Sequence, residues 1–265
     1  MRLATWNVNS IRARIDRVIA FLERSGTDVL AMQELKCKPE QFPFDAFTQA
    51  GYEVAMLGTN QWNGVAIASR VGLADVEEGF EAMPGYVADP DAPEPVLEAR
   101  AITAVTGGVR VSSLYVPNGR ELDHPHYSYK LDWLARLRDT VEASLAARAE
   151  AEFALVGDFN VAPLDSDVWD MAAFEGATHV SAPEREAFQA LLDAGLTDVV
   201  RPHEPTQYTY WDYKSLRFPR NEGMRIDFVL ASPALAARVT GAQIDRNERK
   251  GKGASDHVPV IVDLG

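Results

Sequence analysis

Short runs of apolar, β-branched residues recur along the whole chain and constrain its fold more than any other feature. Thr106-Gly107-Gly108 lies between two of these runs and is typical of a hairpin turn, so we expect part of the sheet to be antiparallel. The strand-like runs cover residues 3–8, 29–33, 65–69, 101–105, 109–116, 153–157, 226–231 and 258–262. The chain is therefore predicted to be dominated by strands.

The predicted helices do not alternate regularly with the strands. Apolar residues between Ile11 and Leu22 recur every three or four positions, which is typical of an amphipathic helix, and Gly26 is expected to end it. Two more helices are expected, over residues 127–148 and around residues 188–192. This order of elements favours an α+β fold of packed sheets over a parallel βαβ series.

The chain has the size of one large domain. Its 265 residues, 46% of them hydrophobic, are enough to bury a sizeable core. The segment 83–95 holds four prolines and several acids, and we expect an irregular exposed loop that is too short to link two domains. We therefore predict a single domain over residues 1–265.

Two features favour a cytoplasmic location. No apolar run has membrane-spanning length, and the N-terminus enters a strand-like run without the apolar core of a signal peptide. Cys37, the single cysteine, has no partner for an internal disulfide, which fits a reducing compartment. We expect a cytoplasmic monomer with no membrane partner.

The formal net charge of −13 argues against a protein that binds polyanions over its whole surface. The charge is unevenly distributed along the chain. Residues 121–200 hold 16 acids against 5 bases, whereas residues 201–257 hold 10 bases against 7 acids. A phosphate-binding surface is therefore expected in the C-terminal quarter.

Polar side chains suited to binding a cation stand where many of the predicted strands end. Loops at strand ends can bring such groups together around one cleft. Glutamate, aspartate and asparagine oxygens suit a hard cation such as Mg²⁺ or Mn²⁺. The residues are Asn7, Asn9, Glu34, Tyr115, Asn118, Asp158, Asn160, Asp227, Asp256 and His257.

Each of these residues also has an ordinary structural explanation. Glu34 fits a solvated acid at a strand end, and Asp158 fits a turn cap. Asp227 fits a surface ion pair with Arg225, and His257 fits a hydrogen-bonded histidine in a turn. Because all the clusters would have to be incidental at once, their recurrence favours a shared metal site.

The motifs resemble, in their order, those of the exonuclease III family of apurinic/apyrimidinic (AP) endonucleases, within the superfamily that includes DNase I. The resemblance spans nearly the whole chain. Its pieces are TWNVNSIRAR at 5–14, LAMQELK at 30–36, NGVAI at 63–67, YVPNG at 115–119, GDFNVAP at 157–163, TYWDYKS at 209–215, MRIDFVLAS at 224–232 and SDHVPV at 255–260. It implies a four-layer sandwich in which helices flank two packed, mainly antiparallel sheets.

The resemblance also implies metal-assisted hydrolysis of a phosphodiester. Glu34 would hold Mg²⁺, with Mn²⁺ as substitute, and Asp158 would activate or orient the attacking water. His257, oriented by Asp227, would hold a phosphate oxygen. Whether one or two metal ions take part is left open. The implied metal residues are Asn7, Glu34, Asp158, Asn160, Asp256 and His257, and the implied catalytic residues are Tyr115, Asp158, Asn160, Asp227 and His257.

The segment 208–225 resembles the DNA-contacting loop of the family. There Trp211 would pack against the sugar of an abasic site, because its apolar face can fill the space of a missing base. Core packing is the alternative for this residue, and ordinary surface charge is the alternative for the arginines. The DNA-contacting residues implied are Trp211, Arg217, Arg220, Asn221 and Arg225.

The expected enzyme is a DNA repair nuclease that acts on duplex DNA with abasic sites or blocked 3′ ends. A phosphatase or phosphodiesterase with a substrate other than DNA is the alternative, and a catalytically inactive damage-binding module is a weaker one. Lys130 matches a Tyr-Lys pair of the family, but solvent exposure explains it as well, and it is not included in the site. The remaining histidines, His124, His126, His179 and His203, are expected at the surface.

Overall fold

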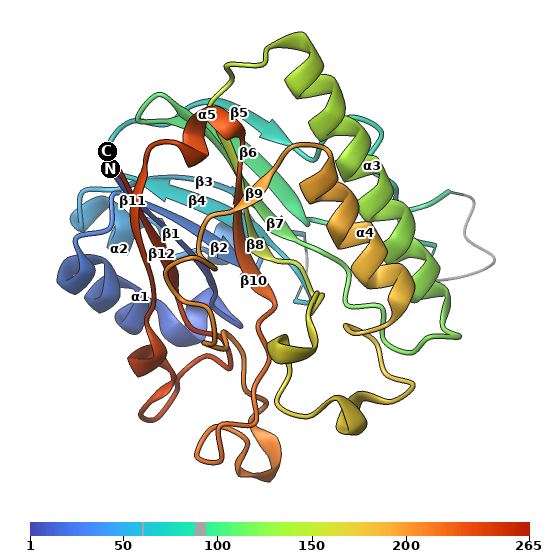
Figure 1. Cartoon of the computed structure of the whole chain (residues 1–265). Helices are drawn as coiled ribbons and strands as arrows, with labels where there is room; N and C mark the ends of the chain where they lie inside the picture. Colours follow the sequence, from blue (N-terminus) through green and yellow to red (C-terminus); the bar gives the residue numbers. More distant parts are fainter. Residues whose placement is uncertain (60, 88–93) are drawn as a thin grey trace.

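The computed structural model describes residues 1–59, 61–87 and 94–265 and consists of two six-stranded sheets packed face to face (Figure 1). The first sheet has the order β11-β12-β1-β2-β4-β3, and the second has the order β5-β6-β7-β8-β10-β9. The strands of the first sheet are β1 (Arg2–Asn7), β2 (Val29–Gln33), β3 (Glu53–Leu57), β4 (Val65–Ser69), β11 (Val239–Ile244) and β12 (Val260–Leu264). Those of the second are β5 (Ala74–Glu78), β6 (Ala101–Thr106), β7 (Val109–Tyr115), β8 (Phe153–Asp158), β9 (Thr197–Asp198) and β10 (Asp227–Ala231).

Helices cover both outer faces of this pair of sheets. In Figure 1, α1 (Ile11–Ser25) and α2 (Phe44–Gln49) lie outside the first sheet, and α3 (Pro125–Ala147) and α4 (Ala182–Asp193) lie outside the second. A short helix, α5 (Pro233–Ala236), follows β10. Turns of 3₁₀ helix cover Pro39–Gln41, Asp165–Asp167, Met171–Phe174, Lys214–Leu216 and Arg246–Arg249.

The sheets are mainly antiparallel, as predicted. Among the strand pairs in the described part of the chain, β1–β2 and β7–β8 are parallel and the others are antiparallel. The Gly107-Gly108 turn joins β6 to β7 as expected, with both glycines in the left-handed region at φ 56° and 82°. The four-layer sandwich is therefore confirmed.

Three apolar layers hold the sandwich together. Side chains such as Val29 and Val156 fill the space between the two sheets, where they are fully buried. Phe21 packs edge-on against Trp6 beneath α1, and Trp133 of α3 packs edge-on against Phe80 over the second sheet. Burial on both faces explains why the central strands read as continuous apolar runs.

The predicted strands and helices are found within a few residues of their expected bounds. The missed strands β3, β5, β9 and β11 lie at sheet edges, and every residue of β5 is exposed, so no apolar pattern marks it. Of the predicted loop 83–95, positions 88–93 lie outside the described residues, and at its ends Tyr86 and Val96 pair across an isolated bridge. No helix in the described ranges is long and apolar enough to cross a membrane.

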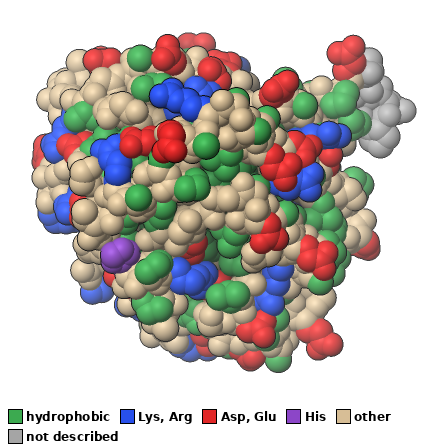
Figure 2. Space-filling view, turned by 45° about the horizontal axis from the view of Figure 1, so that its top comes forward, with side chains coloured by type: hydrophobic (Ala, Val, Ile, Leu, Met, Phe, Trp, Pro, Cys, Tyr) green, Lys and Arg blue, Asp and Glu red, His purple; other side chains and the backbone are tan. Residues whose placement is uncertain are grey.

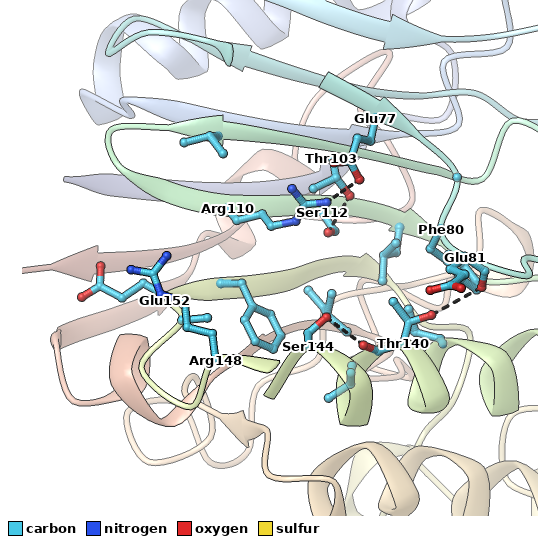
Figure 3. A pocket seen from close by; sticks show the side chains of 18 of the residues that line it. Glu77, Phe80, Glu81, Thr103, Arg110, Ser112, Thr140, Ser144, Arg148 and Glu152 are labelled. Atoms are coloured by element: carbon cyan, nitrogen blue, oxygen red, sulfur yellow. Dashed lines mark hydrogen bonds and ion pairs between the residues drawn. The ribbon is translucent and has the colours of Figure 1, made fainter. Parts of the chain in front are cut away.

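A cavity of about 730 Å³ lies between the second sheet and α3, away from the strand ends that carry the polar clusters (Figure 3). Arg110 pairs with Glu77 on its sheet side, and Thr103 bonds Ser112. Arg110 stands near the start of β7, whereas Tyr115 ends that strand. The cavity lining reaches Leu114 but includes neither Tyr115 nor Asp158, so the cavity is separate from the polar cluster.

Candidate active site

Sheet topology brings the predicted polar clusters to one edge of the sandwich. Asn7 is the last residue of β1, and Glu34 directly follows the parallel strand β2. Tyr115 is paired with Asp158 at the ends of the parallel strands β7 and β8. Asp227 begins β10, which runs antiparallel to β8 and pairs with it at Asp158. Parallel strands end at the same edge, and an antiparallel neighbour begins there, so residues more than 200 positions apart meet in space.

Glu34, Asp158 and His257 form the centre of this cluster. One potential ligand atom from each lies within 4.8 Å of the others. Asn7 joins the two carboxylates, because its Nδ2 donates to Glu34 Oε1 at 2.8 Å and to Asp158 Oδ2 at 3.0 Å. The Asn7 Oδ1 accepts instead from the backbone of Asn9 at 3.0 Å. In this structure Asn7 therefore organises the carboxylates and does not turn its oxygen toward them.

His257 is held by a buried carboxylate. Its Nδ1 lies 2.8 Å from Asp227 Oδ2, and its Nε2 lies 3.7 Å from Asp158 Oδ2. Burial would lower the pKa of His257, but the charges of Asp227 and Asp158 outweigh it and raise the pKa to about 10. The ring is therefore a cation at neutral pH, with Nε2 facing the cluster as a hydrogen-bond donor. The ring of Tyr210 packs against it, 4.8 Å between centroids.

The two carboxylates of the cluster differ in acidity. Burial, reinforced by the charges of Asp227 and Glu34, raises the pKa of Asp158 to about 7 despite the opposing charge of His257. For Glu34, burial also favours the neutral form, but the ammonium of Lys36, 2.7 Å from Oε2, and the hydrogen bond from Asn7 hold the pKa below its usual value. Asp158 is thus a base poised near neutrality, beside a Glu34 that is ionised at neutral pH.

Asn160 and Tyr115 border the same cluster. The backbone N–H of Asn160 donates to Asp158 Oδ1 at 2.9 Å, and its side-chain Nδ2 donates to the carbonyl of Val116 at 3.0 Å. Burial and the nearby charge of Glu34 raise the pKa of Tyr115 well above its usual value, so its hydroxyl keeps its proton. Glu34 and Asn160 both have positive φ, 53° and 51°, a strained backbone that is concentrated at functional sites.

Asp256 lies beside the cluster. Its Oδ1 accepts a hydrogen bond from Asn9 Nδ2 at 2.9 Å, and the Asn9 Oδ1 accepts from Lys36 Nζ at 2.6 Å. A chain of polar contacts therefore connects Asp256 to Glu34. In this arrangement Asp256 stands behind the central ligands, and its direct contact with a metal stays a prediction.

The donor set fits a divalent cation. Glu34 and Asp158 supply carboxylate oxygens close together, and two adjacent carboxylates in a buried site repel each other unless a cation lies between them. Asp227 Oδ1 is buried without a hydrogen-bond partner within the described structure, which leaves an acceptor available beside the cluster. Because Asp227 binds Nδ1 and favours a proton on the ring, the Nε2 of His257 is suited to an anionic phosphate, and its direct contact with a metal stays a prediction.

We expect Asp227→Asn to lower the pKa of His257 in the metal-free protein, because Asp227 is the strongest of the charges that raise it. In the wild type, protonation of this ring stabilises the fold fully below pH 6.5, and that contribution is lost as the pH rises to about 10. In the variant the loss should come at lower pH. NMR titration of the His257 ring protons measures this. Asp256→Asn, which removes a weaker charge, is the control, and an unchanged pKa in Asp227→Asn would contradict the assignment.

The structure contradicts two of the predicted DNA contacts. Trp211 is 0% exposed and packs edge-on against Phe218 between the sheets, while its backbone N–H donates to the carbonyl of Asp256 at 2.9 Å. Arg225 is 1% exposed and bonds Glu204 and Asp198. Neither side chain offers surface to DNA. Trp211 instead supports the loop that carries Asp256 and His257, and the alternative of core packing was the correct one.

The other predicted DNA contacts lie on an exposed loop. Arg220 is exposed, Arg217 is half-buried, and both pair with Glu222, at 2.8 and 2.6 Å. Asn221 is exposed and accepts from Arg246 at 3.3 Å. Their contact with DNA stays a prediction.

Three side chains that support the site were not predicted from the sequence. Lys130, set aside as a solvated residue, is fully buried. His179, expected at the surface, is partly buried, and its Nε2 lies 3.1 Å from Asn160 Oδ1 and 3.2 Å from Asn118 Nδ2. His126 is also buried, and its Nδ1 accepts from the backbone of Gly119 at 3.1 Å. The Tyr-Lys pair was the only feature of the sequence that pointed to a role for Lys130. No local pattern indicated that the two histidines lie near the site.

Comparisons with known proteins agree with this geometry. The model of the Endonuclease/Exonuclease/phosphatase family matches residues 4–257. Exodeoxyribonuclease III of Haemophilus influenzae is 29% identical over 273 residues, covering 98% of this chain and 98% of that protein. A 3′ phosphatase from Neisseria, bound to a product DNA hairpin, matches with TM-score 0.90 at 38% identity, and an AP endonuclease from Archaeoglobus fulgidus matches with TM-score 0.89 at 34% identity. Each structural match covers 100% of this chain and 99% of the other. The chain therefore belongs to the Endonuclease/Exonuclease/phosphatase family and is exonuclease III-like.

Proposed function

We propose that this chain is a DNA repair nuclease that hydrolyses phosphodiester bonds at abasic sites and removes nucleotides or phosphate from 3′ ends. The cluster of Glu34, Asp158 and His257 carries the proposal, since it combines an ionised carboxylate, a base near neutrality and a cation within 4.8 Å. The names of the relatives add the DNA substrate. We further propose that residues 1–265 act as one catalytic domain and as a monomer.

The residues can be assigned to the requirements of phosphodiester hydrolysis. Glu34 and Asp158 would hold Mg²⁺, or Mn²⁺ in its place, which neutralises phosphate charge and the developing charge of the leaving oxygen. Asp158, which the backbone N–H of Asn160 holds in place, would accept a proton from the attacking water or orient it. The Nε2 of His257 would donate to a phosphate oxygen, while Asp227 keeps the ring oriented and charged. Tyr115, protonated, would donate a hydrogen bond to the phosphate or the leaving group.

The charge pattern of the surface allows DNA to approach the site despite the net charge of −13. Arg12, Lys36 and Lys38 line a hollow next to Glu34. Arg217 and Arg220 belong to the segment 208–225 that precedes β10, drawn in orange at the low end of Figure 1. Figure 2, turned toward the opposite end, shows acidic and basic side chains mixed over the surface. Basic groups at the site edge support phosphate binding there.

We propose that exposed apolar side chains near the site make the DNA contact that the sequence had suggested for Trp211. Tyr213 is 50% exposed and Leu216 is 71% exposed, on the same loop as Arg217. The Tyr213 hydroxyl donates to the carbonyl of Ala254 at 2.9 Å, which fixes this loop beside the one carrying Asp256. Side chains of this kind can pack against a sugar or an unstacked base.

Incision of labelled duplexes tests the proposal. A duplex with one abasic site and a duplex with a 3′-phosphate should be processed, and an inositol phosphate at the same concentration should not. An intact blunt duplex serves as the reference for exonuclease digestion. Faster turnover of the inositol phosphate than of either DNA would favour the alternative, a phosphatase of another substrate. No turnover of any of them would overturn an enzymatic function.

A further inference from the structure

The one fully buried lysine–glutamate pair in the described part of the chain lies directly behind the site. Lys130 of α3 and Glu184 of α4 are both 0% exposed, and the Lys130 Nζ donates to the Glu184 Oε1. An ion pair so deep in a protein is seldom a net source of stability, because desolvation offsets much of the attraction. The other contacts of Lys130 and Glu184 are therefore a better explanation for the pair than stability.

The remaining donors of Lys130 reach two loops that carry site amides. Its Nζ donates to the carbonyl of Asn160 at 2.6 Å and to the carbonyl of Asn118 at 3.2 Å. With Glu184 as the third acceptor, all three N–H bonds of the ammonium are used. Gly119 lets the chain pass this closely: it has φ 93°, and a Cβ there would lie 3.3 Å from the Lys130 Cδ. One cation thus ties together the loop after β7 and the loop after β8.

Glu184 connects a third loop to the same point. Its Oε2 accepts from both the N–H and the hydroxyl of Ser181, at 3.2 and 2.6 Å, so it closes the capping box of α4 as well as neutralising Lys130. Ser181 follows His179, whose Nε2 lies 3.1 Å from Asn160 Oδ1 and 3.2 Å from Asn118 Nδ2 and, depending on the tautomer, donates to the first or accepts from the second. Burial, reinforced by the charge of Lys130, lowers the pKa of His179 to about 3 and keeps that ring neutral.

We infer that Lys130 and Glu184 are positioning residues, which hold Asn160 and Asn118 in a fixed relation to Asp158. The inference rests on the proposed function of the same site. Asn118 Nδ2 donates to Asn160 Oδ1 at 3.1 Å, and the Asn160 N–H donates to Asp158, so a shift of either loop moves the amides against the carboxylate. When such groups are misplaced, the rate of reaction falls more than the affinity for substrate does.

The double variant Lys130→Met/Glu184→Gln tests the inference. It removes both charges, fills the lysine volume with an apolar chain and keeps an acceptor for Ser181. We expect kcat on an abasic-site duplex to fall by about 10- to 100-fold with KM changed less than about 3-fold. Leu134→Ala, a fully buried core truncation on the same helix, is the control for general destabilisation and should leave kcat within about 3-fold of wild type.

A spectroscopic readout separates this inference from the proposed function. The Asn160 side-chain NH₂ signals, identified by their absence in Asn160→Asp, should shift in the double variant and stay in place in Leu134→Ala. Unchanged signals together with unchanged kcat in the folded double variant would overturn the inference. If the double variant does not fold, Glu184→Gln alone is measured, and wild-type signals and kcat there would overturn it equally. A wild-type protein inactive on DNA would refute the proposed function, while the NH₂ signals would still decide the inference.

Discussion

Asp158→Asn is expected to lower kcat for incision of an abasic-site duplex by about 10²- to 10⁴-fold, the range for loss of a general base. The substitution keeps the shape and the acceptor oxygen of the side chain, and it removes the group with a pKa of about 7. Incision of a labelled duplex under single-turnover conditions measures the effect. Asp132→Asn, which alters a half-exposed acid on α3, is the matched control and should retain wild-type kcat.

The Asp158→Asn substitution should not unfold the protein. A carboxylate whose pKa is raised in the folded state binds its proton more tightly there, so the wild type loses stability as the pH rises from 3.8 to about 7. Asparagine removes this loss, and the metal-free variant should be at least as stable as the wild type at pH 8. Urea unfolding measures this. Wild-type incision by Asp158→Asn, or a variant that unfolds at pH 8, would contradict the assigned role.

Removal of divalent cations with EDTA is expected to reduce incision to background, and added Mg²⁺ or Mn²⁺ should restore it. The cation would offset the repulsion between Glu34 and Asp158 as well as the charge of the phosphate. It should also stabilise the fold, by about 2.7 kcal/mol at 100 times its dissociation constant. Thermal unfolding with and without cation measures this separately from activity.

Glu34→Gln is the comparison for the metal experiment. It removes the ionised carboxylate of the cluster, so the cation should raise its melting temperature much less than that of the wild type. Full activity of the wild type in EDTA would exclude the metal role. An equal rise in melting temperature for both proteins would place the cation elsewhere in the molecule.

Local sequence patterns were enough to predict the central strands and the polar clusters at their ends. Central strands such as β2, β4 and β8 are buried at every residue and consist mainly of apolar residues, whereas the edge strand β5 is exposed throughout and has no such pattern. Gly26 ends α1 in the left-handed conformation at φ 64°, as predicted from its position after the last apolar residue. These features depend on a few neighbouring residues, which the sequence displays directly.

The roles of Trp211, Lys130 and His179 were not visible in the same way. A tryptophan beside arginines is compatible with a DNA contact and with a buried core residue. Trp211 is a core residue because it packs against Phe218 and is fully buried in the folded chain. A lysine on a long helix is usually solvated, yet Lys130 meets Glu184 because α3 and α4 lie side by side over the second sheet (Figure 1). Each outcome depends on residues distant in sequence.

The sequence by itself determined which chemical groups this protein has at its strand ends, and hence the family and the class of reaction. The tertiary structure decided which of these groups face one another, and through those contacts their charge: Asp227 raises the pKa of His257, whereas burial raises that of Asp158. It also decided that Trp211 is core and Lys130 part of the support of the site. Burial and Coulomb interactions act through space, so they follow from the packing of distant segments and not from the order of residues along the chain.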